Sequence, residues 1–171
     1  MVVVCLKHRR NSEFWSSLLI LLATVIFSVV AYVRWLNFSF FVGSLFFVHW
    51  LGLAATVFIA GLVPIYYLLK RKRPQKIKIL LKFHVFGNLL SFLLVSIHFA
   101  QNTGRLAQFY PRLEDGFVLF LVLSIIVATG MIERFGAKLK PVRYTKSVHR
   151  YTVTIFYFVT IIHVLQGFSI I

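Results

Sequence analysis

Four histidines lie in two long apolar segments of the chain, and their spacing indicates ligation of a metal. His84 and His98 are fourteen positions apart, as are His149 and His163, and the offset from the first pair to the second is the same for both members. Fourteen residues return a helix to nearly the same face about 21 Å further along its axis. If the two segments are parallel helices, His84 meets His149 and His98 meets His163. Two imidazoles that face each other across a gap can ligate a haem iron from both sides.

A single histidine in an apolar helix is usually a packed or hydrogen-bonded residue, but two matched pairs are hard to ascribe to chance. Ionisable residues at membrane depth are costly and are commonly functional. A zinc site is the structural alternative, but zinc prefers clustered ligands supported by carboxylates. No carboxylate stands beside these histidines in the sequence. The pattern therefore predicts two haems b, held non-covalently because the single cysteine, Cys5, excludes the paired thiols of covalent attachment.

Glycines and basic residues near the histidines are further candidates for haem contact. Glycine lets a flat macrocycle approach the backbone, although ordinary helix packing explains the same residues. Basic residues suit the anionic haem propionates, although membrane topology alone explains those of the inner cluster. These candidates are Gly87, Gly116, Gly130, Lys82, Arg150 and Arg105. His49 has no partner at the spacing of the other histidines. It is interpreted as a helix contact or as a quinone-binding or proton-handling residue, the latter together with Glu133.

The composition is that of an integral membrane protein. Hydrophobic residues make up 60% of the chain and charged residues only 13%, which is too few to surround a soluble core. Apolar segments of about 18 residues or more recur along the chain, as in transmembrane helices. The sequence predicts an all-α membrane protein with five transmembrane helices, at about Phe14–Leu36, Phe40–Leu69, Ile79–Gln101, Gly116–Phe135 and Val148–Ile171.

These helices define the expected organisation of the chain. Residues 1–13 should form a cytoplasmic tail and residues 14–36 a peripheral transmembrane helix. Residues 40–171 should form a di-haem core, a haem-binding four-helix bundle. Pro64 lies inside the second of the five helices and is expected to kink it.

The basic residues predict the orientation in the membrane. The net charge is +15, and with five spans nearly all of the 19 Lys and Arg residues fall on one side. The exceptions are Arg34, Arg105 and Arg112. The positive-inside rule then places the amino terminus in the cytoplasm and the carboxyl terminus outside, and it explains the charge without a nucleic-acid partner. The third and fifth helices would run parallel, as the histidine pairing requires. The lack of a transit peptide favours a prokaryotic plasma membrane.

The arrangement resembles two families of haem-binding membrane proteins. Paired histidines on two parallel helices, with a spacer helix whose glycines repeat the histidine spacing, are similar to cytochrome b of quinol-oxidising complexes. The runs KFHVFGNLLSFLLVSIHF and SVHRYTVTIFYFVTIIHV resemble the two histidine helices of the ferric-reductase-like transmembrane family. The resemblance extends from Phe40 to the end of the chain and implies two haems b. No glycine-rich dinucleotide-binding motif accompanies it.

Together these features predict transmembrane electron transfer, with the chain acting as the membrane cytochrome b subunit of a redox complex. A quinol or a partner protein would be the donor or the acceptor, and the lipid bilayer is the other expected partner. Two alternatives stay open. One is a stand-alone quinol-linked or ferric-reductase-like oxidoreductase, and the other is a non-redox membrane scaffold that carries haem.

Overall fold

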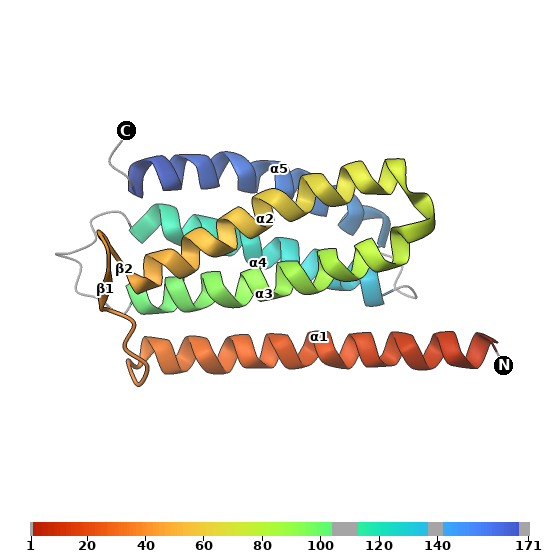
Figure 1. Ribbon diagram of the computed structural model, residues 1–171, viewed down its shortest axis with the longest axis horizontal. Helices are drawn as coiled ribbons and strands as arrows, with labels where there is room; N and C mark the ends of the chain where they lie inside the picture. The colour runs from red at the N-terminus through yellow and green to blue at the C-terminus, as the bar shows by residue number, and fades with distance from the viewer. Residues whose placement is uncertain (1, 104–112, 137–141, 168–171) are drawn as a thin grey trace.

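The computed structural model describes residues 2–103, 113–136 and 142–167, which are almost entirely helical. The long helices are α1 (Val2–Tyr32), α2 (Phe47–Lys72), α3 (Ile77–Thr103), α4 (Leu113–Phe135) and α5 (Val142–Gly167) (Figure 1). A short antiparallel hairpin precedes α2 and consists of β1 (Phe41–Val42) and β2 (Leu45–Phe46). A 3₁₀ turn, η1 (Pro74–Lys76), joins α2 to α3. The predicted all-α fold with five long helices is confirmed.

Several helix boundaries differ from the sequence prediction. The expected helix start at Phe40 is wrong, because residues 41–46 form the hairpin and α2 begins at Phe47. Gly43 adopts a φ of +64° at the turn, a conformation that glycine accepts without strain. The indole of Trp50 fixes the hairpin to α2 by donating a 2.9 Å hydrogen bond to the carbonyl of Val42. α1 and α5 begin earlier than expected, at Val2 and Val142.

Basic residues and a proline end α2 sharply. Lys70, Arg71 and Lys72 form its last turn, where cations interact favourably with the carbonyl end of the helix dipole. Pro74 then begins η1, because proline cannot continue the hydrogen-bond ladder of an α-helix but fits the first turn of a new one. Pro64 lies inside α2, which continues through it as a single helix. Because of the turn that begins at Pro74, α3 runs back along α2 in the opposite direction.

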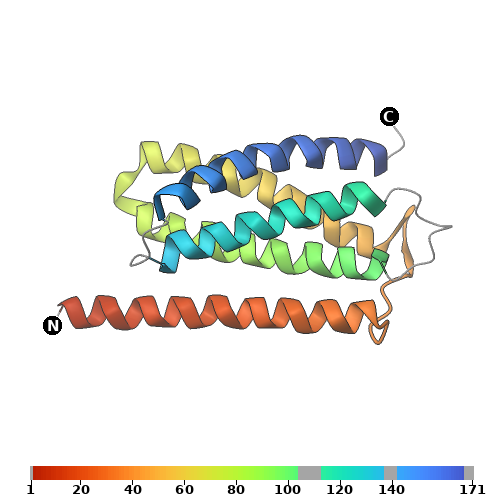
Figure 2. The ribbon, with the colours of Figure 1, turned by 180° about the vertical axis from the view of Figure 1, so that it is seen from behind.

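The helices form a four-helix bundle with one helix beside it. α2 packs mainly against α3, α4 packs mainly against α5, and α3 and α4 join the two pairs. Within the described residues, α5 makes few direct contacts with α2 or α3. α1 packs against α3, on the side of the bundle away from α5 (Figures 1 and 2). The predicted bundle with a peripheral first helix is therefore what the chain forms.

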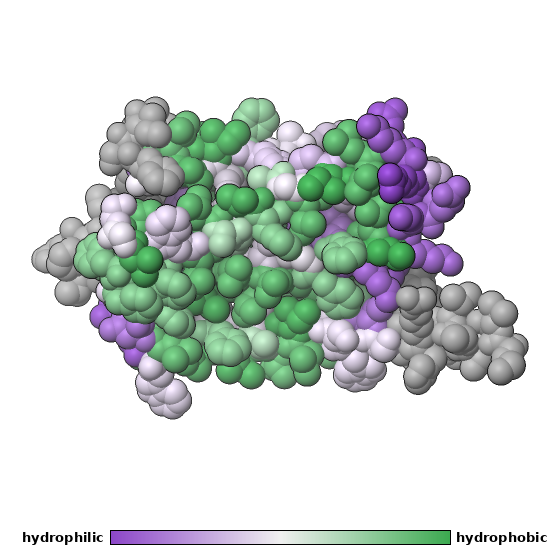
Figure 3. All heavy atoms as spheres, in the orientation of Figure 1, coloured by the Kyte–Doolittle hydropathy of each residue, from purple (hydrophilic) through white to green (hydrophobic). Residues whose placement is uncertain are grey.

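All five long helices are long and apolar enough to cross a membrane, and the chain is an integral membrane protein. Hydrophobic side chains cover most of the visible flank of the bundle, and hydrophilic ones gather at the end that carries the turn between α2 and α3 (Figure 3). α3 and α5 both begin at this end, so the two histidine helices are parallel, as predicted (Figures 1 and 2). α1 also begins at this end, and α5 ends at the other (Figure 1).

Two polar contacts fix the peripheral helix to the bundle. Gln101 on α3 is 1% exposed. Its amide donates a hydrogen bond to the carbonyl of Ala31 at 3.2 Å and accepts one from the backbone of Phe38 at 3.2 Å. At the other end, Glu13 on α1 forms ion pairs with Lys82 on α3, at 2.8 Å, and with Arg134 on α4. These contacts position α1 because polar groups in an apolar environment need partners.

Replacing Glu13 with glutamine is expected to loosen α1 and lower the unfolding temperature. Glu13 is 8% exposed, and the substitution removes both ion pairs while keeping the shape of the side chain. We expect a loss of about 1.5–3 kcal/mol, the range for a hydrogen bond to a charged group. Thermal unfolding in detergent measures the change. The control is Glu133→Gln, since Glu133 Oε1 has no hydrogen-bond partner in the described part of the chain. Equal unfolding temperatures for both variants would contradict a clamping role of Glu13.

Candidate functional site: two histidine levels

The four histidines lie at two levels of the bundle, on helices that begin at the same end. His84 and His149 lie toward the basic end, where α3 and α5 start, and His98 and His163 lie toward the other end. All four side chains are half-buried. His84 is the eighth residue of α3 and His149 the eighth of α5. His98 and His163 line one cavity. The structure thus places the four histidines at two levels, with His98 and His163 on the walls of one cavity.

Three of the four imidazole rings lie against a glycine of a neighbouring helix. A Cβ atom added to Gly52 on α2 would lie 3.0 Å from His98 Nδ1. A Cβ atom on Gly130 of α4 would lie 3.3 Å from His149 Cε1, and one on Gly116 would lie 3.7 Å from His163 Cε1. Glycine therefore lets each ring lie close to the adjacent backbone. Gly116 and Gly130 were predicted from the sequence to lie near these histidines, whereas Gly52 was not singled out.

His84 lies instead against an aromatic ring. Tyr66 on α2 stacks on His84 with ring centroids 4.5 Å apart and an interplanar angle of 23°. Tyr66 follows Gly52 by fourteen positions, and α2 is antiparallel to α3, so both α2 positions face histidines of α3. The spacing of the histidines therefore recurs on all four helices of the bundle. The spacing alone does not distinguish Gly52 and Tyr66 from the other pairs of α2 positions that are fourteen residues apart.

Two of the histidines are oriented by backbone carbonyls. His98 Nδ1 lies 2.8 Å from the carbonyl oxygen of Val48, and His149 Nδ1 lies 3.1 Å from that of Ile126. Thr129 Oγ1 is also 3.0 Å from His149 Nδ1. A histidine that donates its Nδ1 proton to a carbonyl carries its lone pair on Nε2. Metal-binding histidines commonly show this arrangement, which fixes the tautomer and the ring plane. For His98 and His149, this arrangement fits a histidine that would hold a haem iron through Nε2.

An asparagine follows each α3 histidine by one helical turn. Asn88 Nδ2 lies 3.2 Å from His84 Nδ1, and Asn102 Nδ2 lies 3.3 Å from His98 Nε2. The side-chain oxygens of both asparagines are buried without a hydrogen-bond partner among the described residues. Such groups are uncommon in native structures and are found where a ligand or water binds. The repeated His-x3-Asn pattern is visible in the sequence but was not part of the prediction.

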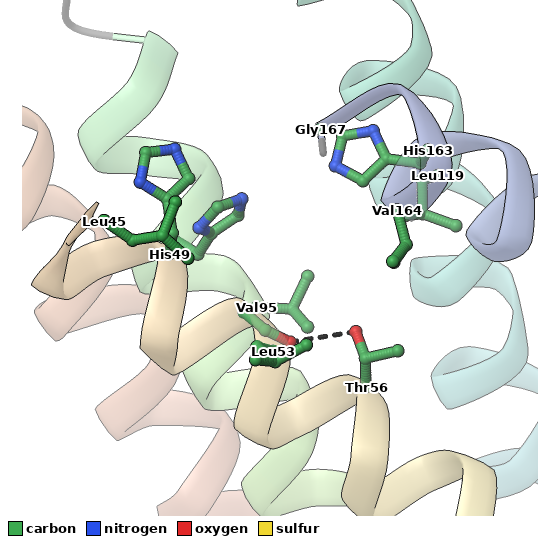
Figure 4. Close-up of a pocket in the computed structure, with 11 residues that line it drawn as sticks. Leu45, His49, Leu53, Thr56, Val95, Leu119, His163, Val164 and Gly167 are labelled. Atoms are coloured by element: carbon green, nitrogen blue, oxygen red, sulfur yellow. Dashed lines mark hydrogen bonds between the residues drawn. The ribbon is translucent and has the colours of Figure 1, made fainter. Parts of the chain in front are cut away.

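The level of His98 and His163 opens into a cavity between the helix pairs. Its volume is about 110 Å³, and it is partly open to the outside, so it is smaller than the usual range of about 300 to 1,000 Å³ for ligand pockets. His49 lies on the α2 side and His163 on the α5 side, with Leu53, Val95 and Thr56 also around the space between them (Figure 4). His49 meets His98 edge to face, with centroids 5.6 Å apart. The sequence alone left the role of His49 open, and the structure makes it part of the cavity wall.

An apolar layer separates the two levels. Within the described residues, no three His, Cys, Asp or Glu side chains gather where they could hold one metal ion. Phe156 lies midway between His149 and His163 on α5 and is 4% exposed. It packs in a buried core with Ile59, Leu119 and Leu123. An apolar core therefore lies between the two histidine levels.

The other residues that were predicted to contact haem have other partners, are exposed or lie outside the described residues. Gly87 faces α2, where an added Cβ would collide with Leu62 and meet Phe58 at 3.0 Å, so its close approach serves helix packing. Lys82 is paired with Glu13, which gives it a partner within the chain in place of a propionate. Arg150 is exposed on α5. Arg105 lies outside the described residues. The propionate assignments therefore gain no support from the packing.

Comparisons of the chain with protein-family models, with curated proteins and with solved structures find no match.

Proposed function

We propose that this protein is a transmembrane electron-transfer cytochrome b with two haems. His84 and His149 would hold one haem iron, and His98 and His163 would hold the other. The observation that carries the proposal is the matched register of all four helices. Each histidine ring meets a supporting residue on α2 or α4, and the supporting residues repeat at the same spacing as the histidines. Chance packing of isolated histidines gives no reason for such a repeat.

The chain's own residues orient the ligands and leave room for them. Bound haem, which two histidines would hold at each level, would supply a one-electron redox centre there. The carbonyls of Val48 and Ile126 fix the tautomers of His98 and His149. The glycines of α2 and α4 leave room for the rings. Sparse contacts between α3 and α5 in the described part of the chain support a position for the macrocycle between these two helices.

The orientation and the partners follow from charge. The positive-inside rule puts the basic end, with His84 and His149, at the cytoplasmic face of a prokaryotic plasma membrane. A quinol or a partner protein would exchange electrons at one of the levels. In that setting the chain serves as the membrane subunit of a redox complex. The cavity beside His98 and His163 favours one alternative in particular, a stand-alone quinol-linked or metal-reducing oxidoreductase whose substrate enters there.

Haem content tests the proposal directly. The chain purified in mild detergent should give two haems b per chain in a pyridine haemochrome assay. Its reduced-minus-oxidised spectrum should show low-spin bands, as two bis-histidine irons require. Reduction by a quinol analogue would link the protein to the quinone pool, and reduction by dithionite alone would indicate a protein partner. A preparation without haem, even after reconstitution with haemin, would contradict the proposal.

Replacing Tyr66 with leucine is expected to change the inner haem alone. Tyr66 stacks on the ring of His84, and its loss frees that ring to rotate about its side-chain bonds. The low-spin electron paramagnetic resonance signal of the inner haem depends on the angle between its two imidazole planes and should shift. The control is Tyr67→Leu, because the neighbouring Tyr67 is 61% exposed. Identical spectra for the two variants would show that Tyr66 does not set the orientation of His84.

A further inference from the structure

The turn between α2 and α3 carries a dense cluster of exposed basic residues. Six cations fall between positions 70 and 78, on the last turn of α2, around η1 and at the start of α3. They are Lys70, Arg71, Lys72, Arg73, Lys76 and Lys78, and all six are exposed. Hydrophilic side chains accordingly gather at this end of the bundle (Figure 3). We call these six residues the turn cluster.

The chain itself supplies few anions to offset the turn cluster. It has only four acidic residues. Two of them, Glu114 and Asp115, stand at the start of α4, which begins at the opposite end of the bundle (Figure 1). Glu13 is held by two ion pairs with other basic residues. Within the described residues, no member of the turn cluster forms an ion pair. Like charges this close repel one another, so the cluster attracts anions from outside the chain.

The length of α2 places the turn cluster at the depth of lipid headgroups. About 20 helical residues cross the hydrocarbon layer of a bilayer, and counted from Phe47 at the start of α2 they reach Tyr66. At a rise of about 1.5 Å per residue, Lys70 to Lys72 then lie about 6–9 Å further along the axis. The headgroup region adds about 5–8 Å on each side of the hydrocarbon. The last turn of α2 therefore lies beside the phosphates of the lipids.

Two cations of the turn cluster lie back along α2, toward the apolar flank of the bundle. Lys70 Nζ is over the ring of Tyr66, 5.9 Å from its centroid, and the guanidinium of Arg71 is over Tyr67 at 6.0 Å. Both rings belong to the preceding helical turn. Tyr67 is 61% exposed and its neighbour Leu68 is 55% exposed, as expected where a helix leaves the acyl chains and tyrosine marks the interface. These two cations therefore face lipids beside the bundle.

We propose that the turn cluster binds anionic phospholipids, whose phosphate groups contact Lys70 and Arg71. Clusters of about four to eight Lys or Arg residues next to a transmembrane helix attract acidic lipids, and each cation strengthens the attraction about fivefold. An acidic protein is the alternative partner. The depth of the cluster and the exposed apolar residues beside it favour lipid. Lipid binding requires no haem, so this inference is independent of the proposed function.

The test is titration of the full-length chain, in a neutral detergent, with phosphatidylglycerol and separately with phosphatidylcholine. Native mass spectrometry counts the bound lipids and gives a Kd for each. Phosphatidylglycerol should bind saturably and about tenfold more tightly than phosphatidylcholine, and added salt should weaken its binding. Lys70→Gln should weaken phosphatidylglycerol binding about fivefold, and Lys70→Gln combined with Arg71→Gln about 25-fold, at about fivefold for each cation.

Lys146→Gln is the matched control for Lys70→Gln. Lys146 is an exposed lysine near the start of α5, at the same end of the bundle, so its substitution removes the same charge. It should bind phosphatidylglycerol as the wild type does. Equal weakening by the two substitutions would reveal only a general attraction to a cationic protein and would overturn the inference. Equal affinities of the wild type for the two lipids would overturn it too.

A polyglutamate peptide tests the alternative partner on the same samples. Saturable binding of this peptide that is lost with Lys70→Gln and Arg71→Gln, without a preference for phosphatidylglycerol over phosphatidylcholine, would assign the turn cluster to an acidic protein and overturn the inference. A preference for phosphatidylglycerol that falls with the substitutions in the turn cluster, and not with Lys146→Gln, supports it.

Discussion

Replacing any one of the four histidines with leucine is expected to remove one of two haems. His98→Leu and His163→Leu should lose the same haem, because both side chains line one cavity. His84→Leu and His149→Leu should lose the other. Leucine has nearly the volume of histidine and suits the apolar helices, but it cannot ligate iron. Haem stoichiometry from the pyridine haemochrome assay should fall by half in each variant. A redox titration, which should show two midpoints in the wild type, should retain only one.

The pairing of the histidines gives the more specific test of this expectation. The two variants of one pair should retain a haem with the same midpoint potential. The variants of the other pair should retain a haem with a different midpoint potential. His49→Leu is the matched control, since His49 contacts the His98 ring edge to face but has no partner at the spacing of the other histidines. It should retain both haems. If His84→Leu and His98→Leu were to lose the same haem, the two levels would not be separate sites.

Replacing Gly52 with valine is expected to eliminate the outer haem and spare the inner one. The Cβ atom of any larger residue there would lie 3.0 Å from His98 Nδ1 and 3.1 Å from Cγ of the same ring. The ring would have to move away from α2, which breaks the 2.8 Å contact between His98 Nδ1 and the carbonyl of Val48. Loss of that contact releases both the tautomer and the plane of the ring. Haem stoichiometry and the surviving midpoint measure the effect.

Gly61 provides the control for this substitution. It lies on the same helix, and an added Cβ there meets nothing within 4 Å. Gly61→Val changes the helix propensity of α2 as Gly52→Val does, so a difference between the two variants reports on His98 alone. We expect Gly61→Val to retain both haems. Retention of both haems by Gly52→Val as well would show that the glycine is not needed to seat the ring.

The sequence predicted the five helices because long apolar segments in a chain with little charge have few other stable arrangements. It predicted the wrong start for α2, since residues 41–46 are as apolar and aromatic as a helix entering a membrane. The hairpin depends on the positive φ of Gly43 and on the indole of Trp50 reaching back to Val42. A hydrophobicity pattern indicates neither the backbone conformation of Gly43 nor the hydrogen bond from Trp50. α1 was expected to be peripheral, but its attachment through Gln101 and Glu13 joins residues far apart in the chain.

The sequence by itself determined the two histidine levels, because the helical repeat converts the spacing within each pair into one face and a fixed rise. Combined with the charge pattern, it also determined that the two histidine helices are parallel. Only the tertiary structure decided what surrounds each ring: Gly52 against His98, Tyr66 against His84, and carbonyls of neighbouring helices at the Nδ1 atoms. The tertiary structure also decided that Lys82 pairs with Glu13 and that Gly87 faces α2. Helical periodicity fixes which residues share a face of one helix. The rotation and separation of neighbouring helices depend on the packing of all their side chains at once.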